Sequence, residues 1–375
     1  MLASRHIALS ILAGLCGAAA VALTPTGAQA IVINDADAGP NVNDPNDGDD
    51  VAVVGAVFAD SVAQVLIPLG GGSANICSGA LISSTHLLTA EHCFYDANGM
   101  LITSNPQVTF FDIDGVQQST RTGTDVILMG PDPGPGTQPP LLDGTDLAVI
   151  ELATPFEARF EPLRLLEDPA DVLGDVGVLV GYGLVGQGST GVNSGVSDRP
   201  RGATQALEYY GPAVLSFDAN TPNDPADDVL VPFPGTENIY SIDFDDPADP
   251  DGPSNVFGQD LFNQPGSGLP PQVTGFEGTT AGGDSGGPLL VNFVAADTNE
   301  PEWLIAAALS GGSVGNSSYG DLSYWTGVGS DEAQAFLEPF GEYVERASIP
   351  VPATGGLLAA AAAVLAFAGR RRRPA

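Results

Sequence analysis

The chain has 375 residues, enough for one large domain or two, and its 46 acidic residues face 11 arginines and no lysine, giving a formal net charge of −35. A surface this acidic repels nucleic acid and anionic membranes, so nucleic acid is not expected among its partners. Hydrophobic residues make up 43% of the chain, which is typical of a globular protein with a sizeable core.

The N-terminal segment, residues 1–30, has the pattern of a secretory signal peptide. A basic residue precedes an apolar run over 7–23, and Ala28-Gln29-Ala30 is a small-x-small site for signal peptidase. The mature chain is therefore expected to begin near Ile31 and to be exported to the cell envelope or the medium. Residues 31–50 are acidic and rich in Asn and Pro, which predicts an exposed or mobile lead-in.

Regular structure is expected from residue 51. Short apolar runs, partly β-branched, alternate with turn residues and predict the strands of a barrel or sandwich. They lie at 51–57, 62–69, 80–82, 87–90, 108–111, 126–129, 147–152 and 176–180. Helical spacing of apolar residues occurs in DEAQAFLEPFGEYVER, at Ala333, Phe336, Leu337, Phe340 and Val344. Pro339 predicts that this helix is short or broken.

A second acidic, proline-rich stretch, residues 217–260, interrupts the strand pattern and is expected to be an insertion. It places five aspartates within nine residues, at Asp243, Asp245, Asp246, Asp249 and Asp251. Calcium prefers clustered carboxylates, but the alternate ligands and distal Glu of an EF-hand loop are missing. A solvated acidic loop is the favoured interpretation, and no metal or other cofactor is predicted.

The stretch GTTAGGDSGGPLL, residues 278–290, surrounds Ser285 with glycines. Glycine permits unusual backbone conformations and close approach of a ligand, so the sequence exposes a serine beside free backbone N–H groups. Acyl transfer needs this arrangement, together with a base for the hydroxyl and a third group that orients the base.

The candidates for base and third group are few. Outside the signal segment the histidines are His86 and His92. His92 follows an apolar strand and precedes Cys93, so it is the favoured base, whereas His86 is interpreted as structural. Asp146 stands just before the apolar run 147–150 and is the candidate carboxylate. After signal removal only Cys77 and Cys93 remain, and in an exported protein they most simply form one disulfide.

Together these segments resemble the chymotrypsin/trypsin-like serine proteases of the S1 type. The resemblance is carried, in the family's order, by CSGALISSTHLLTAEHC, TDLAVIEL, GYG at 181–183 and GGDSGGPLL. It covers about residues 51–346, the predicted protease domain. The resemblance implies an all-β fold of two packed six-stranded antiparallel Greek-key barrels with a short C-terminal helix.

By this resemblance His92 is the general base, Asp146 orients it, Ser285 attacks, and the N–H groups of Gly283 and Ser285 form the oxyanion hole. The implied function is a secreted or envelope-associated serine endopeptidase that acts on protein or peptide substrates through an acyl-enzyme. The alternative is a catalytically weak or inactive surface binding protein that uses the stretch 217–260 for recognition.

The resemblance also places the primary specificity pocket. Thr279, six residues before Ser285, matches its floor, and Ser310 with Gly312 matches its wall. An uncharged floor predicts cleavage after neutral residues. Asp321 is the rival feature, because it would select Arg or Lys if its side chain pointed inward.

One departure and one open choice follow from the comparison with the family. Glu91 replaces the small residue before the histidine, which places a charge near the site. In many members the counterpart of Asp284 pairs with a freshly cut Ile-Val terminus. Here the candidates for that terminus are Ile31-Val32 and Val53-Val54, and the sequence leaves both open.

The C-terminal segment, residues 347–375, is predicted to be a sorting tail. It contains IPVPA at 349–353, an apolar stretch over 355–369 and four arginines. It resembles the VPLPA/PEP-CTERM tails of Gram-negative bacteria, and its VPATG is also close to the LPxTG signal of Gram-positive sortases. Fifteen helical residues rise about 22 Å, short of a membrane core of about 30 Å. Transient membrane association and processing by an exosortase- or sortase-like enzyme are therefore expected.

Overall fold

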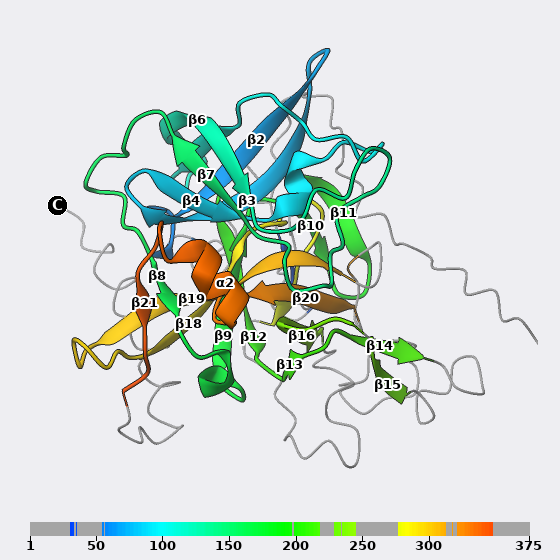
Figure 1. Ribbon diagram of the computed structural model, residues 1–375, viewed down its shortest axis with the longest axis vertical. Coiled ribbons are helices and arrows are strands. Elements are labelled where there is room, and N and C mark those ends of the chain that lie inside the picture. The colour runs from blue at the N-terminus through cyan, green and yellow to red at the C-terminus, as the bar shows by residue number, and fades with distance from the viewer. Residues whose placement is uncertain are drawn as a thin grey trace, which may run out of the picture.

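The computed structural model describes residues 31–33, 35, 55, 57–196, 199–217, 229–233, 235–244, 277–312, 317 and 321–347. These residues are mostly β, with few helices (Figure 1). The helical elements are η1 (Glu91–Phe94), η2 (Pro169–Val172) and α2 (Asp331–Leu337). Within these ranges no helix has the length and apolar character needed to cross a membrane. The predicted signal segment, and the predicted tail beyond Ala347, lie outside the described residues.

The first barrel is closed by six strands in the order β2-β3-β4-β7-β6-β5. These are β2 (Val62–Gly70), β3 (Ser73–Ser83), β4 (His86–Thr89), β5 (Gln107–Phe111), β6 (Gln117–Leu128) and β7 (Ala148–Leu152). Every neighbouring pair is antiparallel. β4 pairs with β7 rather than with β5, the next strand in the chain, which is the long connection of a Greek key.

The interior of this barrel explains why these runs form strands. Side chains alternate across a strand, and the inward positions carry Val65, Leu81, Val108, Phe110 and Ile150, all fully buried. Closure leaves no unpaired sheet edge, so the barrel is a rigid support for the segments attached to its rim.

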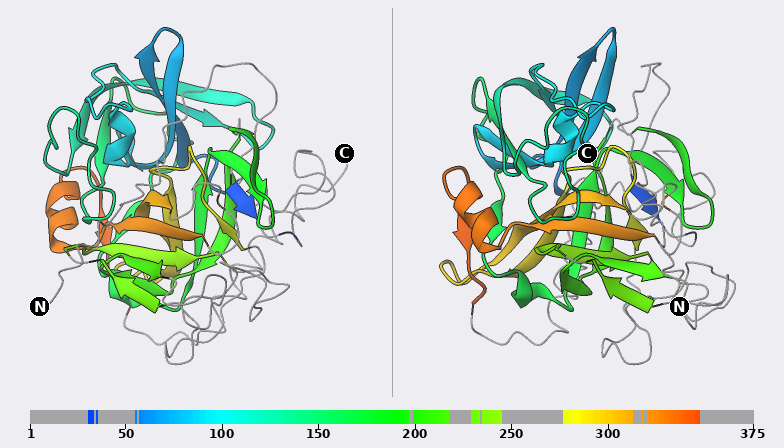
Figure 2. Two further views of the ribbon diagram at one scale, coloured as in Figure 1. Left: turned by 90° about the vertical axis from the view of Figure 1, so that its right-hand side faces the viewer. Right: turned by 45° about the vertical axis from the view of Figure 1, so that its right-hand side comes forward.

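The second sheet has nine strands, and its main path runs β12-β9-β18-β19-β20-β16-β13. These are β9 (Val176–Gly181), β12 (Arg201–Ala206), β13 (Tyr209–Gly211), β16 (Ile239–Asp243), β18 (Pro288–Val294), β19 (Pro301–Gly312) and β20 (Leu322–Gly327). β8 (Arg164–Leu166) adds to β19 in parallel, and β21 (Tyr343–Val344) adds to β8. The sheet curls as a half-barrel beside the closed one (Figure 2).

The predicted all-β fold of two barrel-like sheets is therefore confirmed. In the described part of the chain the second sheet has more strands than the six predicted and is curled rather than closed. The predicted short helix is also confirmed: Ser330 caps α2 by accepting the Ala333 N–H, and α2 ends before Pro339. Val344, which continues the helical spacing, lies instead in strand β21.

Two smaller sheets complete the fold. One has the order β11-β10-β1-β17 and the other is the hairpin β14-β15. Their strands are β1 (Ile31–Ile33), β10 (Leu184–Gln187), β11 (Gly191–Val196), β17 (Gly278–Thr279), β14 (Val214–Phe217) and β15 (Val229–Pro232). In Figure 2, β1 is the isolated dark blue arrow beside the green strands.

Two sequence-based boundaries differ from the structure. Residues 31–33 were predicted to belong to an exposed lead-in, but they form β1 and are at most 2% exposed, because strands from two distant segments cover them. The stretch 217–260 was predicted to be an insertion, yet it supplies β15 and the fully buried β16. Of the five aspartates in it only Asp243 is described, and it is buried. The described residues contain no group of His, Cys, Asp and Glu arranged to hold a metal.

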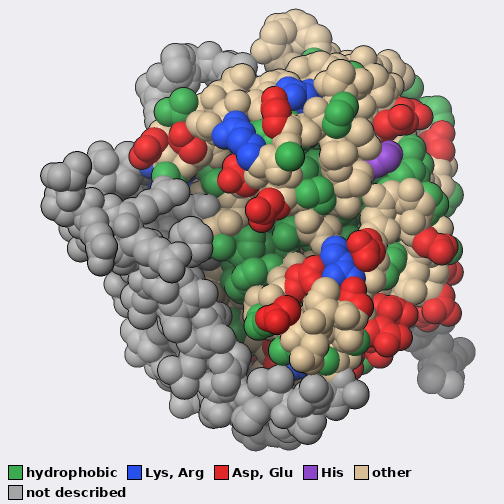
Figure 3. Space-filling view, turned by 90° about the vertical axis from the view of Figure 1, so that its left-hand side faces the viewer, with side chains coloured by type: hydrophobic (Ala, Val, Ile, Leu, Met, Phe, Trp, Pro, Cys, Tyr) green, Lys and Arg blue, Asp and Glu red, His purple; other side chains and the backbone are tan. Residues whose placement is uncertain are grey.

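The surface agrees with the composition. The face in Figure 3 carries many scattered Asp and Glu side chains and few Arg side chains. On this face the acidic side chains are exposed, as the composition predicts.

Candidate active site

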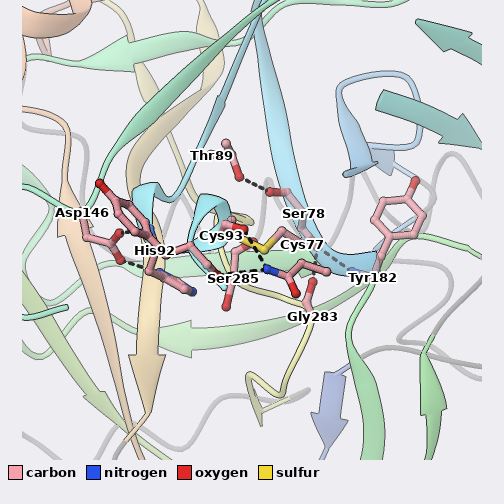
Figure 4. The surroundings of a disulfide bond; sticks show 11 residues. Cys77, Ser78, Thr89, His92, Cys93, Asp146, Tyr182, Gly283 and Ser285 are labelled. Atoms are coloured by element: carbon pink, nitrogen blue, oxygen red, sulfur yellow. Dashed lines mark hydrogen bonds and ion pairs between the residues drawn. A yellow bond between two sulfur atoms is a disulfide. The ribbon is translucent and has the colours of Figure 1, made fainter. Parts of the chain in front are cut away.

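His92 lies on η1, directly after β4 at the rim of the closed barrel. The disulfide between Cys93 and Cys77 of β3 fastens η1 to the barrel, as predicted. The Asn75 side-chain amide donates hydrogen bonds to the Cys93 carbonyl (3.1 Å) and to the Tyr95 carbonyl (3.2 Å). One covalent bond and two buried hydrogen bonds therefore fix the backbone that directly follows His92 (Figure 4).

Asp146 contacts His92 with both carboxylate oxygens. Oδ2 lies 2.8 Å from the His92 Nδ1, and Oδ1 accepts the His92 backbone N–H at 2.8 Å. The Asp146 side chain is fully buried and that of His92 is 11% exposed. The hydrogen bond that the carboxylate accepts from Nδ1 orients the ring. It leaves Nε2, on the other side of the ring, to exchange protons.

The charge around the imidazole follows from this contact. Burial lowers the pKa of His92, but the charge and hydrogen bond of Asp146, together with the charge of Glu91, outweigh it and raise the pKa above its ordinary value. The surroundings thus favour the imidazolium that forms when the ring accepts a proton.

Ser285 lies in the loop between β17 and β18, on the half-barrel. Figure 4 places its side chain on the opposite side of His92 from Asp146. Gly283 and Gly286 flank it with φ values of 103° and 77°. A Cβ on Gly286 would lie 2.1 Å from the Thr89 Oγ1, so a glycine is required where this loop meets β4.

Ser78 of β3 joins the nucleophile loop to the closed barrel. Its backbone N–H donates to the Ser285 carbonyl (2.8 Å), and its hydroxyl donates to the Gly283 carbonyl (3.0 Å). The Tyr182 N–H donates to the same hydroxyl at 2.9 Å. Sequence reasoning gave Ser78 no role. The sequence feature that could have indicated a role for Ser78 is its position directly after Cys77, on the strand that faces the half-barrel.

The carbonyls of this loop are engaged, whereas two of its amides are not. Within the described ranges no hydrogen bond is donated by the N–H of Gly283 or of Ser285. Two free neighbouring N–H groups beside a serine hydroxyl are able to bind an anionic oxygen.

The Asp284 side chain is 2% exposed and lies against Gly181 of β9 in the half-barrel. Its carboxylate accepts the N–H groups of Gly183 (2.7 Å) and Ala281 (2.9 Å). Burial raises the pKa of Asp284 to about 7, against the lowering effect of these two hydrogen bonds.

Strand β1 lies close to this carboxylate. Ile31 pairs in parallel with Val185, two residues beyond Gly183, and Val32 pairs with Thr279, two residues before Ala281. Of the two candidate termini, Ile31-Val32 is thus beside the segments that bind Asp284, and Val53-Val54 lies outside the described residues.

The residues assigned to the specificity pocket lie on neighbouring strands. The hydroxyls of Thr279 and Thr280 lie 2.8 Å and 3.2 Å from the Ser323 hydroxyl, and all three side chains are buried. Gly312 pairs with Ser323 across β19 and β20. Sequence reasoning named Thr279 and Gly312 but missed Thr280 and Ser323, because the strand register that brings Ser323 opposite Gly312 is not visible in the sequence.

The remaining pocket candidates are also buried. The Ser310 hydroxyl lies 2.6 Å from that of Thr326 on β20. Asp321 is 1% exposed, and a Cβ built on Gly312 would lie 3.1 Å from its Oδ2. The Asp321 carboxylate, the rival charged group, therefore lies next to Gly312, which was assigned to the wall of the pocket.

A closed barrel and a half-barrel that meet at an aspartate, a histidine and a glycine-flanked serine define the architecture of trypsin-like proteins. Comparison with known proteins supports this class: residues 56–210 match the family model described as Trypsin, which supports a trypsin-like serine protease domain. A segment of 143 residues is 30% identical to "Serine protease filzig" of Drosophila melanogaster. The match covers 36% of this chain and 8% of that protein, so the chain spans less than a tenth of this relative's length. The matched range 56–210 includes His92 and Asp146 and ends before Ser285.

Proposed function

We propose that the chain is an exported serine endopeptidase that cleaves peptide bonds through Ser285, His92 and Asp146. The observation that carries this proposal is the two-point contact of a buried Asp146 with His92, on the side of the ring opposite Ser285. An aspartate in this position holds the ring in the tautomer in which Nε2 accepts a proton.

In the proposed first half-reaction the Ser285 Oγ attacks the carbonyl carbon of the substrate while its proton moves to the His92 Nε2. The carbonyl oxygen becomes an anion bound by the Gly283 and Ser285 N–H groups. His92 then gives its proton to the leaving amine, the C–N bond breaks, and an ester of Ser285 remains. Asp146 stays ionised and stabilises the imidazolium throughout.

In the second half-reaction water replaces the amine. His92 accepts a proton from water, the hydroxide attacks the ester carbon, and the same two N–H groups bind the second oxyanion. Its collapse breaks the bond to the Ser285 Oγ, which regains the proton from His92. The products are a carboxylate and a free enzyme, and no cofactor is needed.

The proposed substrates are proteins or peptides with a neutral residue before the cleaved bond. Support comes from the three hydroxyls of Thr279, Thr280 and Ser323, which are polar and uncharged. A disulfide beside the base fits an exported protein, since such bonds persist in oxidising compartments. Signal peptidase and an exosortase- or sortase-like enzyme remain the proposed processing partners.

The test combines covalent labelling with three variants. A serine-directed fluorophosphonate is expected to label Ser285, and Ser285→Ala and His92→Ala are each expected to reduce kcat by about four to six powers of ten. His86→Ala is the matched control, because the His86 Nδ1 bonds the Ser83 Oγ at 2.8 Å and the ring packs on Phe340. Absence of labelling in folded protein, or inactivation by His86→Ala with an active His92→Ala, would overturn the proposal.

A further inference from the structure

Glu91 is a buried carboxylate that the proposed mechanism does not use. It precedes His92 on η1 and is 1% exposed. Its Oε2 accepts the Gly130 N–H at 2.6 Å. Gly130 belongs to the segment between β6 and β7 that leads to Asp146. One side chain therefore links the element that carries the histidine to the segment that carries the aspartate.

The approach of the two segments at this point is close. A Cβ on Gly130 would lie 2.7 Å from the Glu91 Oε2 and 3.0 Å from the Thr145 Oγ1. Thr145 directly precedes Asp146, and its hydroxyl and N–H both donate to the Asp143 Oδ1. The glycine thus lets Glu91 reach the residues next to Asp146 without disturbing their backbone.

The second oxygen of Glu91 has no hydrogen bond. Neither Oε1 nor the nearby Tyr95 hydroxyl has a hydrogen-bond partner within the described part of the chain, although both are buried. A buried carboxylate oxygen without a donor disfavours the ionised form. Burial accordingly raises the pKa of Glu91 to about 7, the charges of Asp146 and Asp143 raise it further, and the hydrogen bond from the Gly130 N–H opposes the rise.

The groups that face Glu91 come from two elements. His92 and Tyr95 are on or next to η1, and Asp143 and Asp146 are on the segment before β7. Asp132 of the same segment faces Tyr95, whose pKa rises to about 12 through burial and these nearby charges. His92 is the one group of this set that gains a positive charge. Ionised Glu91 therefore stabilises the charged form of His92, whereas it destabilises the charged forms of the neighbouring acids.

We propose that Glu91 is a positioning residue that holds the Asp146 segment against η1 and sets, through its own charge, the pH at which His92 loses its proton. Ionised Glu91 favours the imidazolium and so shifts the loss of the His92 proton to higher pH. It also stabilises the imidazolium formed during attack by Ser285. The kinetic consequence rests on the proposed function, whereas the effect on the His92 pKa does not.

The primary test is therefore a measurement of the His92 pKa that needs no activity. NMR titration of the imidazole protons is carried out on Ser285→Ala protein, with the His92 signal assigned from Ser285→Ala/His92→Gln. Adding Glu91→Gln keeps an oxygen that accepts the Gly130 N–H but removes the charge. The His92 midpoint is expected to fall by about one pH unit, the usual size for loss of one nearby charge.

Two controls accompany this measurement. The His86 signal reports folding, and its chemical shift at a fixed pH is expected to be the same in Glu91→Gln as in the parent protein. Glu151→Gln removes the same charge from an exposed position of β7, opposite His86 in the barrel, and is expected to leave the His92 midpoint in place. The proposal would be overturned if the His92 midpoint moved by less than about 0.2 pH units in folded Glu91→Gln. It would also be overturned if Glu151→Gln moved this midpoint as far as Glu91→Gln does.

The second test uses enzyme with Ser285 intact. Glu91→Gln is expected to shift the acidic limb of the pH profile of kcat/KM to lower pH by about the same amount. Glu91→Ala, which also removes the contact with Gly130, is expected to lower the plateau about tenfold as well. An unshifted limb in an active Glu91→Gln enzyme contradicts the inference. If the fluorophosphonate does not label Ser285 in the parent protein, only the proposed function is contradicted. The NMR measurement decides the role of Glu91 independently.

Discussion

The buried Asp284 makes the stability of the chain depend on pH in a predictable direction. Burial raises the pKa of Asp284 to about 7 from an ordinary value of 3.8. Between these two values the folded chain holds a proton that the unfolded chain has lost. Stability from this group is therefore fully present below pH 3.8 and is lost as the pH rises through 7. The substitution Asp284→Asn should remove this dependence.

The magnitude follows from the size of the shift. A difference of about three pKa units corresponds to about 4 kcal/mol over the whole range, of which more than half falls between pH 5 and pH 8. Asparagine keeps one acceptor for the N–H groups of Gly183 and Ala281 and leaves the other donor without a partner, which costs about 1–3 kcal/mol at every pH. The slope against pH, rather than the absolute stability, is thus the informative quantity.

Urea unfolding at intervals from pH 5 to pH 8 measures this slope. Both proteins carry Ser285→Ala to prevent self-cleavage and keep Ala30 joined to Ile31, as in the structure. The unfolding free energy of Asp284→Asn, relative to that of its parent, is expected to rise by about 2 to 3 kcal/mol between pH 5 and pH 8. Parallel curves would refute the reasoning. Protein cut to begin at Ile31 should show a smaller slope, because an amino group on β1 would supply a cation near Asp284.

Two further predictions concern the barrel rim and the pocket. Replacing Cys77 and Cys93 with serine opens a loop of 16 residues. This change is expected to lower the unfolding free energy, measured by denaturant unfolding, by about 3 kcal/mol. Two thiols that titrate in the native protein would contradict the disulfide. A peptide-library profile is expected to show cleavage after neutral residues, unchanged in Asp321→Ala, whereas strong cleavage after Arg or Lys that is lost in this variant would show that Asp321 sets the preference.

Local sequence was sufficient for the features that lie in continuous segments. The disulfide follows from a cysteine count, the short helix from apolar spacing before Pro339, and the strands from short apolar runs between turn residues. The choice of barrels over a sandwich came from the resemblance to the trypsin-like proteases. The roles of His92, Asp146 and Ser285 stay predictions, although the structure brings the three side chains to one place (Figure 4).

The features that sequence missed depend on contacts between distant segments. β16 (Ile239–Asp243) is buried along its whole length, but Asp and Pro residues around it hide its apolar character. Ser323 enters the pocket region only through its register with Gly312. Glu91 accepts its hydrogen bond from the backbone N–H of Gly130. Nearly every residue has a backbone N–H, so the sequence does not indicate which residue donates to Glu91.

The hydrogen bonds of Ser78 also have a consequence for the order in which the molecule is assembled. The closed barrel, with His92 and Asp146, is built entirely from residues 62–152, so this half is able to fold as soon as that length of chain is available. Ser285 is held against β3 only after the chain has extended more than a hundred residues further. Under the proposed mechanism, His92 and Asp146 lack their nucleophile until then. A chain that ends before Ser285 is therefore expected to be unable to cleave peptide bonds.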